Sequence, residues 1–195
     1  MNHFAALTII RDEHRALAAV LHALRHTVKG LVEQGLAPDF QVLRSLLFYI
    51  DAYPERLHHP KETEHLFKTL RQRLPQAAEV LDRLDHDHER GEAAILKLEH
   101  QLLEYEMLGG SRLHEFALAV DQFCDRYMQH MQLEEQEVLP LARQALLPED
   151  WARINAEFEA NRDPLTGHKP EAEYEALLQR IVNLLPPPLG LGPER

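Results

Sequence analysis

Residues that break helices are sparse and widely spaced in this chain of 195 residues. Only 8 residues are glycine, and the breaks leave four stretches of about thirty residues each. Within each stretch apolar residues recur at i, i+3, i+4 and i+7, which places them on one face of a helix. The fourth stretch shows this spacing in Phe116, Val120, Phe123 and Tyr127. The pattern predicts an all-α fold. The main breaks are Gly30 to Pro38, Pro75, Gly109-Gly110-Ser111 and Pro148.

Four amphipathic helices joined by short loops pack most simply as an antiparallel up-down-up-down four-helix bundle. We expect these helices near residues 4–29, 39–73, 76–107 and 111–146, in a bundle domain that spans residues 1–147. Pro54, Pro60 and Pro140 each remove a helix hydrogen bond, so the second and fourth helices are expected to be kinked or interrupted. Residues 148–185 are predicted to form short capping helices packed on the bundle, and the Pro-rich residues 186–195 a frayed tail.

The chain is acidic, with 32 Asp and Glu against 21 Lys and Arg and a formal net charge of −11. Binding to nucleic acid or to an anionic membrane requires the opposite charge. No apolar stretch approaches the roughly 18 residues of a membrane span, and no basic leader precedes an apolar run. The single cysteine, Cys124, excludes an internal disulfide and a Cys-rich zinc site. We expect a cytoplasmic monomer or homodimer that binds neither nucleic acid nor membrane.

The chain contains 13 histidines, and histidine is the commonest metal ligand. Histidine followed four residues later by glutamate places both side chains on one helical face. Two such pairs fall on apolar stripes and are therefore predicted to face the core. His130 and Glu134 continue the apolar row of the fourth helix, and His58 and Glu62 continue that of the second. The other two pairs with this spacing are His88/Glu92 and His100/Glu104.

Each predicted helix directs one histidine inward. In the first helix, His14 lies between apolar residues of the stripe. In the third, His88 aligns with the apolar row, whereas His86 shares its side with charged residues and is assigned to solvent. The two halves of the chain repeat this arrangement, because 44 residues separate His14 from His58 and 42 separate His88 from His130. This repeated helical hairpin is the strongest signal in the sequence.

Burying four imidazoles and two carboxylates in a bundle core is costly unless other groups satisfy them. Two facing carboxylates also repel each other at low dielectric. Cations between them remove both costs, and bundle cores with inward Glu and His are known di-iron and di-manganese sites. Structural zinc takes a closed set of four ligands, which six exceed. A hydrogen-bonded polar network without metal is the alternative interpretation. The predicted metal-binding set is His14, His58, Glu62, His88, His130 and Glu134.

Four segments resemble those of hemerythrin-like, HHE cation-binding domains: Asp12–Arg15, His58–Glu62, Asp87–Glu92 and His130–Glu135. The resemblance covers roughly residues 4–146, and the part that follows looks like an extension carried by some bacterial members. It implies a four-helix bundle around two non-haem iron ions, with the four histidines as terminal ligands and the two glutamates as bridges. Manganese and zinc are the substitutes for iron. Oxygen-carrying hemerythrins have two histidines one turn apart on the third helix, where this chain has His88 and Glu92.

Four further residues are candidates for an extra ligand or for groups that orient the imidazoles. They are His59, His65, Glu92 and Tyr127. A residue next to a ligand on a helix points about 100° away from it, which favours a supporting role for His59. Tyr127 lies one turn before His130, where its ring packs or its hydroxyl acts as a hydrogen-bonding or redox partner. The histidines assigned to the surface are His3, His22, His26, His100, His114 and His168.

Six protein ligands leave coordination positions at two metal ions for a small diatomic molecule or peroxide. The first hypothesis is therefore a di-iron protein that binds or senses oxygen, nitric oxide or iron itself. The alternative is an enzyme-like role in peroxide or nitric oxide detoxification or in iron-sulfur-cluster repair. A metal-free structural bundle is the third, and it predicts that His58→Ala and Glu134→Ala leave folding intact or improved. The sequence contains no nucleophile with a neighbouring base and no phosphate-binding glycine loop, which argues against hydrolases and kinases.

Overall fold

The computed structural model describes residues 4–160, 163–166 and 181–183. Every regular element within these residues is helical, so the all-α prediction is confirmed for them. Of the predicted capping segment 148–185, residues 161–162, 167–180 and 184–185 fall outside them, as does the whole of the predicted tail 186–195. None of the described helices is long and apolar enough to cross a membrane. The α-helices are α1 (Ala5–Gln34), α2 (Phe40–Ile50), α3 (His59–Lys61), α4 (Lys68–Arg73), α5 (Ala78–Leu108), α6 (Leu113–Leu133), α7 (Leu139–Ala145) and α8 (Pro148–Glu159).

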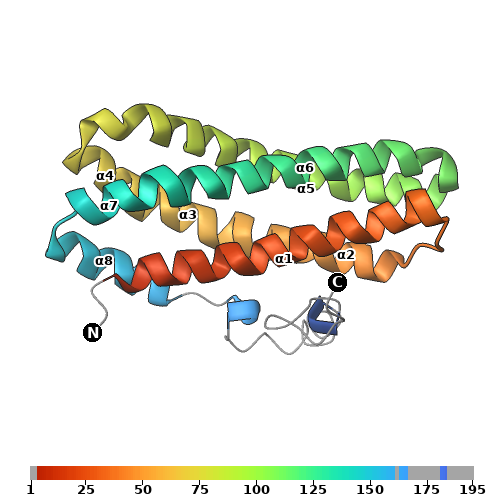
Figure 1. Cartoon of the computed structure of the whole chain (residues 1–195), viewed down its shortest axis with the longest axis horizontal. Coiled ribbons are helices and arrows are strands. Elements are labelled where there is room, and N and C mark those ends of the chain that lie inside the picture. The colour runs from red at the N-terminus through yellow and green to blue at the C-terminus, as the bar shows by residue number, and fades with distance from the viewer. Residues whose placement is uncertain (1–3, 161–162, 167–180, 184–195) are drawn as a thin grey trace.

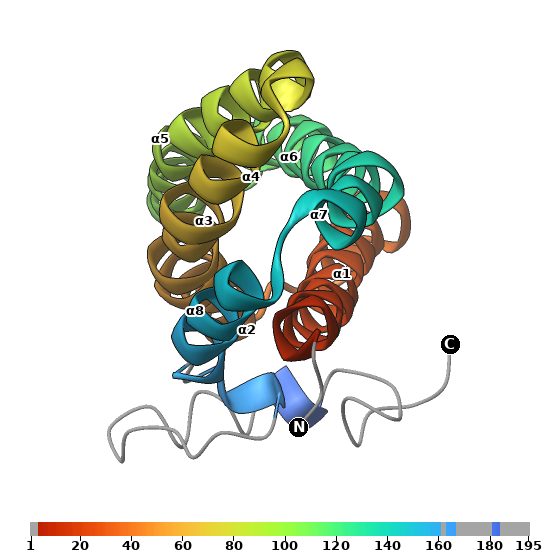
Figure 2. The same cartoon turned by 90° about the vertical axis from the view of Figure 1, so that its left-hand side faces the viewer.

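The long helices lie side by side along the longest axis of the molecule (Figure 1). Seen from one end, α1, the segment from α2 to α4, α5, and the segment from α6 to α7 surround a common centre (Figure 2). α1 packs against α6 and α2, and α5 packs against α2 and α6. A polar group placed on the inner face of any of these helices therefore lies close to the inner faces of the others.

Local signals set the ends of the first two helices. α1 ends at Gly35, whose φ of 63° is a left-handed conformation that glycine adopts without a Cβ penalty. α2 begins after Asp39, whose carboxylate accepts hydrogen bonds from the backbone N–H groups of Gln41 and Val42 at 3.0 and 3.1 Å. α1 extends beyond its expected end at residue 29, and α2 begins one residue after its expected start at residue 39.

The second and fourth helical segments contain wider π-helical turns. These are Asp51–His58, Glu62–Phe67 and Glu134–Val138. Pro54 lies inside the first, Pro60 lies in the short α3 between the first two, and Pro140 follows the third at the start of α7. The expected irregularity is thus present, but the chain stays helical throughout, because the π turns accommodate the missing proline N–H groups. Such turns are frequent at functional sites.

Two apolar clusters form the core, and a polar layer separates them. On α1, residues Leu17 to Leu31 belong to the first cluster and residues Ala6 to Ile10 to the second. Glu13 and His14 lie between the two stretches and are also buried, at 5% and 4% exposure. The core of the bundle therefore changes from apolar to ionisable and back along its length.

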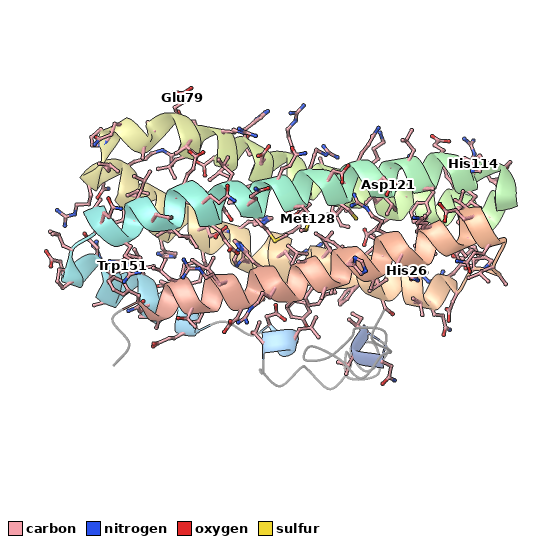
Figure 3. All side chains as sticks on the ribbon, in the orientation of Figure 1. His26, Glu79, His114, Asp121, Met128 and Trp151 are labelled. Carbon is pink, nitrogen blue, oxygen red and sulfur yellow. The ribbon has the colours of Figure 1, made fainter. Side chains whose placement is uncertain are left out.

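The segment after residue 147 closes one end of the bundle. α8 packs against α1 and against the π turn that begins at Glu62. Trp151, Ile154 and Phe158 are buried in the second apolar cluster. Trp151 is labelled on α8 in Figure 3. Arg73 donates two hydrogen bonds to the buried carboxylate of Asp150, at 2.7 and 3.2 Å. α8 is therefore packed against α1 and the second helical segment. That residues 148–185 form a separate capping unit stays a prediction.

Candidate metal centre

The polar layer brings together all six residues predicted to bind metal. They form two groups, and within each group the potential ligand atoms lie within 4.8 Å of one another. The Nε2 atoms of His14 and His58 are 3.2 Å apart, and those of His88 and His130 are 3.1 Å apart. Two facing imidazole nitrogens at this distance require a shared proton or a cation between them. The groups are His14, His58, Glu62 and Glu134, and Glu62, His88, His130 and Glu134.

Glu62 belongs to both groups and divides its two oxygens between them. Its Oε1 lies 3.3 Å from His58 Nε2, and its Oε2 lies 3.6 Å from His88 Nε2. The side chain is completely buried. One carboxylate thus faces both halves of the cluster, as a bridging ligand would.

Glu134 repeats this arrangement from the fourth helical segment. Its Oε2 lies 3.1 Å from His14 Nε2, and its Oε1 lies 3.4 Å from His130 Nε2. Within the described residues, none of the four oxygens of Glu62 and Glu134 accepts a hydrogen bond of good geometry. Buried carboxylates without donors are costly unless a cation satisfies them. This donor set fits two metal ions.

The outer nitrogens of two imidazoles are held by carboxylates. His58 Nδ1 donates to Glu13 Oε2 at 2.6 Å, and His14 Nδ1 donates to Glu135 Oε1 at 2.9 Å. A carboxylate on Nδ1 fixes the tautomer in which the Nε2 lone pair is free. Both rings are therefore oriented to present Nε2 to the centre.

The outer nitrogens of the other two imidazoles face Thr63 and Asp87. Thr63 Oγ1 donates to Asp85 Oδ1 at 2.9 Å, and its lone pair accepts from His88 Nδ1, also at 2.9 Å. Asp87 Oδ2 lies 3.8 Å from His130 Nδ1, too far for a direct hydrogen bond. His88 is thus fixed by a hydroxyl and His130 by a longer electrostatic contact.

Charge within the cluster opposes the effect of burial on its pKa values. Burial by itself lowers the pKa of His14, but Glu134 and Glu135 outweigh it and raise that pKa to about 9. Burial by itself raises the pKa of Glu134, but the charge of His130 and the contact with His14 lower it well below its usual range. Without metal, protons on His14, His58 and His130 balance the negative charge of Glu134. Metal ions would displace these protons, because a ligating imidazole is neutral.

His59 lies closer to the cluster than the helical geometry suggested. It is 5% exposed, and it forms a third group of potential ligand atoms with His88 and His130. Its Nδ1 lies 3.2 Å from Glu55 Oε2. Gly91 makes room for Glu55, because a Cβ at this glycine would lie 2.6 Å from Glu55 Oε1. His58 and His59 therefore both face the polar layer, His58 in the group with His14 and His59 in the group with His88.

Two of the weaker candidates lie outside the cluster. His65 is 39% exposed and lies 3.8 Å from Glu157 Oε2. The π turn that starts at Glu62 rotates it away from the face it would share in a regular α-helix. Glu92 is exposed because it follows the inward-facing Gly91 by one residue. Among the other histidines, His86 is exposed, and His26 and His114 lie on the outside of the bundle (Figure 3).

Tyr127 packs against the histidine cluster. Its ring stacks on that of His59 at a centroid distance of 5.8 Å and contacts Phe123 at 4.7 Å. The residue is 6% exposed, and its hydroxyl has no hydrogen-bond partner among the described residues. The ring therefore packs as expected, whereas its hydroxyl remains available to form a hydrogen bond.

Several residues around the imidazoles were not identified from the sequence. Signals for two of them were present: an acidic residue directly precedes His14, and another lies four residues before His59. The pattern of histidine followed four residues later by glutamate does not include these two glutamates, because each precedes its histidine. The two residues with a signal are Glu13 and Glu55. No periodic signal distinguishes the other three, Thr63, Asp87 and Glu135, from ordinary surface residues.

Comparison with known proteins gave one match. A family model described as Hemerythrin HHE cation binding domain matches residues 5–142. No curated protein and no solved structure matched the chain. The matched range includes all three groups of potential ligands.

Proposed function

The chain belongs to the hemerythrin HHE cation-binding domain family, and on that premise we propose that its polar layer holds two non-haem iron ions. In this proposal His14 and His58 bind one ion, and His88 and His130 bind the other. Glu62 and Glu134 bridge the two, within an antiparallel four-helix bundle. The observation that carries the proposal is the set of four buried carboxylate oxygens without hydrogen-bond donors, each facing an imidazole nitrogen.

We propose that the loaded protein binds or senses a small molecule such as oxygen or nitric oxide, or iron itself. Two iron ions supply one-electron redox chemistry and coordination positions that the protein leaves open. Three polar side chains hold imidazoles in position by bonding to their Nδ1 atoms. They are Glu13 for His58, Glu135 for His14 and Thr63 for His88. The apolar clusters on both sides exclude water from the layer and thereby strengthen its electrostatic interactions. Manganese and zinc compete for the same ligands.

Metal content and the visible spectrum of the purified full chain test this proposal. We expect about two irons per chain by elemental analysis, since each group offers ligands for one ion. Two histidines on α5 provide a matched pair of variants, because His88 faces the centre and His86 is 60% exposed. His88→Ala should lower the iron content, and His86→Ala should leave it unchanged. No bound metal after reconstitution with iron, or one zinc with a featureless spectrum, would contradict the proposal.

Spectra recorded anaerobically and then after air, peroxide and nitric oxide separate binding from turnover. New absorption that disappears when the ligand is removed supports a binding or sensing role. Sustained consumption of peroxide or nitric oxide supports the enzyme-like alternative instead.

A further inference from the structure

Helix α5 carries a second row of residues, mainly apolar, that faces solvent. Its buried row, which includes Ile95, Leu98 and Leu102, faces the core. Two positions before each of these three residues lies a member of an exposed row, and two residues correspond to about 200° around a helix. The exposed row therefore lies on the opposite side of α5, and we call it the outer stripe. It consists of Ala93, Leu96, His100, Leu103 and Met107.

The large apolar members of the outer stripe are strongly exposed. Leu96 is 51% exposed, Leu103 50% and Met107 75%. Single exposed apolar residues are common on proteins, but the members of the outer stripe recur on one face at intervals of three and four residues. This is the spacing at which two helices pair along their length. α5 lies across the bundle from α1, on the outside of the molecule (Figure 2).

A shallow groove beside the outer stripe adds to this apolar surface. It lies between α2 and α5, has a volume of about 280 Å³, and includes Leu47, Phe48 and Leu103 in its lining. Two of its polar lining residues, Arg44 and Glu106, form an ion pair with each other. A helix that lies on the outer stripe would therefore also cover apolar surface of α2.

The charges on one side of the outer stripe complement those of a second copy. Lys97 and Glu104 lie on this side, seven residues apart. Lys97 is exposed and forms no ion pair within 4.0 Å in the described part of the chain. When two α5 helices pair antiparallel, with Leu96 of one copy opposite Met107 of the other, each Lys97 lies next to Glu104 of the other copy. Two-fold symmetry forms this contact twice.

The charges on the other side of the stripe favour the antiparallel over the parallel arrangement. Antiparallel pairing brings Glu99 near Glu106 of the other copy, but Arg44 pairs with Glu106 and offsets their repulsion. Parallel pairing would bring Glu99 near Glu104 instead. The ion-pair partner of Glu104 within the described residues is His100, which carries a charge only when protonated. Two carboxylates would then face each other without an arginine.

From the exposed apolar row and the complementary charges, we propose that the outer stripe binds a second copy of this chain, with the two α5 helices antiparallel about a two-fold axis. Leu96 of each copy packs against Met107 of the other, and Leu103 packs near the axis. The contact goes beyond the proposed metal centre, because none of its residues belongs to the groups of potential ligands. One helix from each copy buries an area near or below the roughly 1,200 Å² of specific interfaces, so we expect a Kd on the order of 10–100 µM.

Sedimentation velocity of the purified full chain, over a range of about 5 to 500 µM, tests the proposal. Salt at about 0.15 M screens the repulsion between two acidic copies. Leu103→Gln should raise the Kd for dimerisation about tenfold, because both copies lose an apolar contact. Leu147→Gln is the matched control, since Leu147 is also exposed, at 41%, but lies between α7 and α8 at the opposite end of the bundle (Figure 1). Its Kd should equal that of the unmodified chain.

Exchange of the two charges tests the pairing itself. Lys97→Glu alone should raise the Kd about three- to tenfold, because it sets two carboxylates against each other at two symmetric positions. Glu104→Lys alone should have a similar effect. The double variant restores the pair in reversed order, so its Kd should return to within about twofold of that of the unmodified chain. Circular dichroism of each variant checks that the fold is unchanged.

The outcomes decide between this arrangement and others. A chain that stays monomeric at the highest concentration overturns the proposal and leaves the outer stripe to a different partner. A dimer that Leu103→Gln does not weaken, or that the double variant does not restore, also overturns it. A dimer that Leu103→Gln weakens, that Leu147→Gln leaves unchanged and that the charge exchange restores supports it. Metal content is not measured in this experiment, so no outcome changes the standing of the di-iron proposal.

Discussion

Three imidazoles of the candidate centre, those of His14, His58 and His88, present Nε2 inward because another residue bonds to their Nδ1. Carboxylates do so for His14 and His58, whereas for His88 the partner is a hydroxyl. The hydroxyl of Thr63 has a single proton, which it donates to Asp85. It can therefore only accept from His88, and this fixes the His88 tautomer.

Thr63→Val removes this acceptor and keeps nearly the same side-chain volume. We expect metal affinity to fall by about tenfold to a hundredfold, as for other groups that orient metal-bound histidines. Competition with a chelator of known affinity measures the change. Thr63→Ser, which retains the hydroxyl, should bind metal nearly normally. Thr69→Val is a second control, because the Thr69 hydroxyl bonds only to the His65 carbonyl. Equal affinities for Thr63→Val and the unmodified chain would exclude a positioning role for this hydroxyl.

At the scale of elements, the irregular turns coincide with the candidate ligands. Glu62 and Glu134 each begin a π-helical segment, and His58 ends one. The spacing of His58 and Glu62 predicted a shared face, and the structure places these two side chains together. His65, which lies within the π-helical segment that begins at Glu62, is instead 39% exposed. Helical periodicity therefore predicted which histidine and glutamate side chains lie together, but not the positions of the neighbours within the wider turns.

The segment after α8 contacts the bundle through Asp163. Its carboxylate accepts hydrogen bonds from the Tyr49 hydroxyl at 2.8 Å and the Leu165 N–H at 2.9 Å. Burial raises the pKa of Asp163 to about 6, opposed by these two hydrogen bonds and supported by the charge of Glu13. The folded state therefore holds a proton that the unfolded chain releases near its ordinary pKa of about 4.

Because the pKa of Asp163 is raised in the folded state, we expect the free energy of unfolding to fall as pH rises. Between about pH 4 and pH 6 the unfolded chain binds fewer protons than the folded one, so stability falls by about 2–3 kcal/mol from this group. Asp163→Asn cannot lose a proton and should remove that part of the pH dependence. Urea unfolding at several pH values measures it, with exposed Asp121→Asn as the control. Parallel pH profiles for Asp163→Asn and the unmodified chain would contradict the assignment.

At the scale of the whole molecule, a layer of ionisable groups interrupts an apolar core. Two clusters of buried apolar residues lie on either side of it, and both include residues of α1. Without metal, the layer contains carboxylates and imidazoles with incomplete hydrogen bonding. Ions that bind only the folded chain should therefore stabilise it as a unit.

Thermal unfolding with and without iron measures this coupling. An ion at one hundred times its Kd adds about 2.7 kcal/mol per site, and each kcal/mol raises the Tm of such a chain by about 2–4 °C. Two sites predict a rise in Tm of about 10–20 °C. Glu134→Ala should lose most of that rise, because Glu134 belongs to both groups of potential ligands, whereas surface His86→Ala should keep it. An unchanged Tm in the presence of iron would favour the metal-free structural bundle.

The sequence by itself determined the helices and the histidine that each turns inward. Both follow from the spacing of apolar residues, which is a local property of the chain. His88 was distinguished from His86 on this basis, and the two lie as predicted, one facing the core and the other solvent. Whether the inward residues bind metal stays a prediction.

Only the tertiary structure decided which residues surround the inward-facing histidines. The contact between His58 and Glu13 spans 45 residues, and that between His14 and Glu135 spans 121. Contacts between distant residues arise from packing, and packing depends on the volumes of all side chains at once. A periodic pattern along one helix carries no information about them.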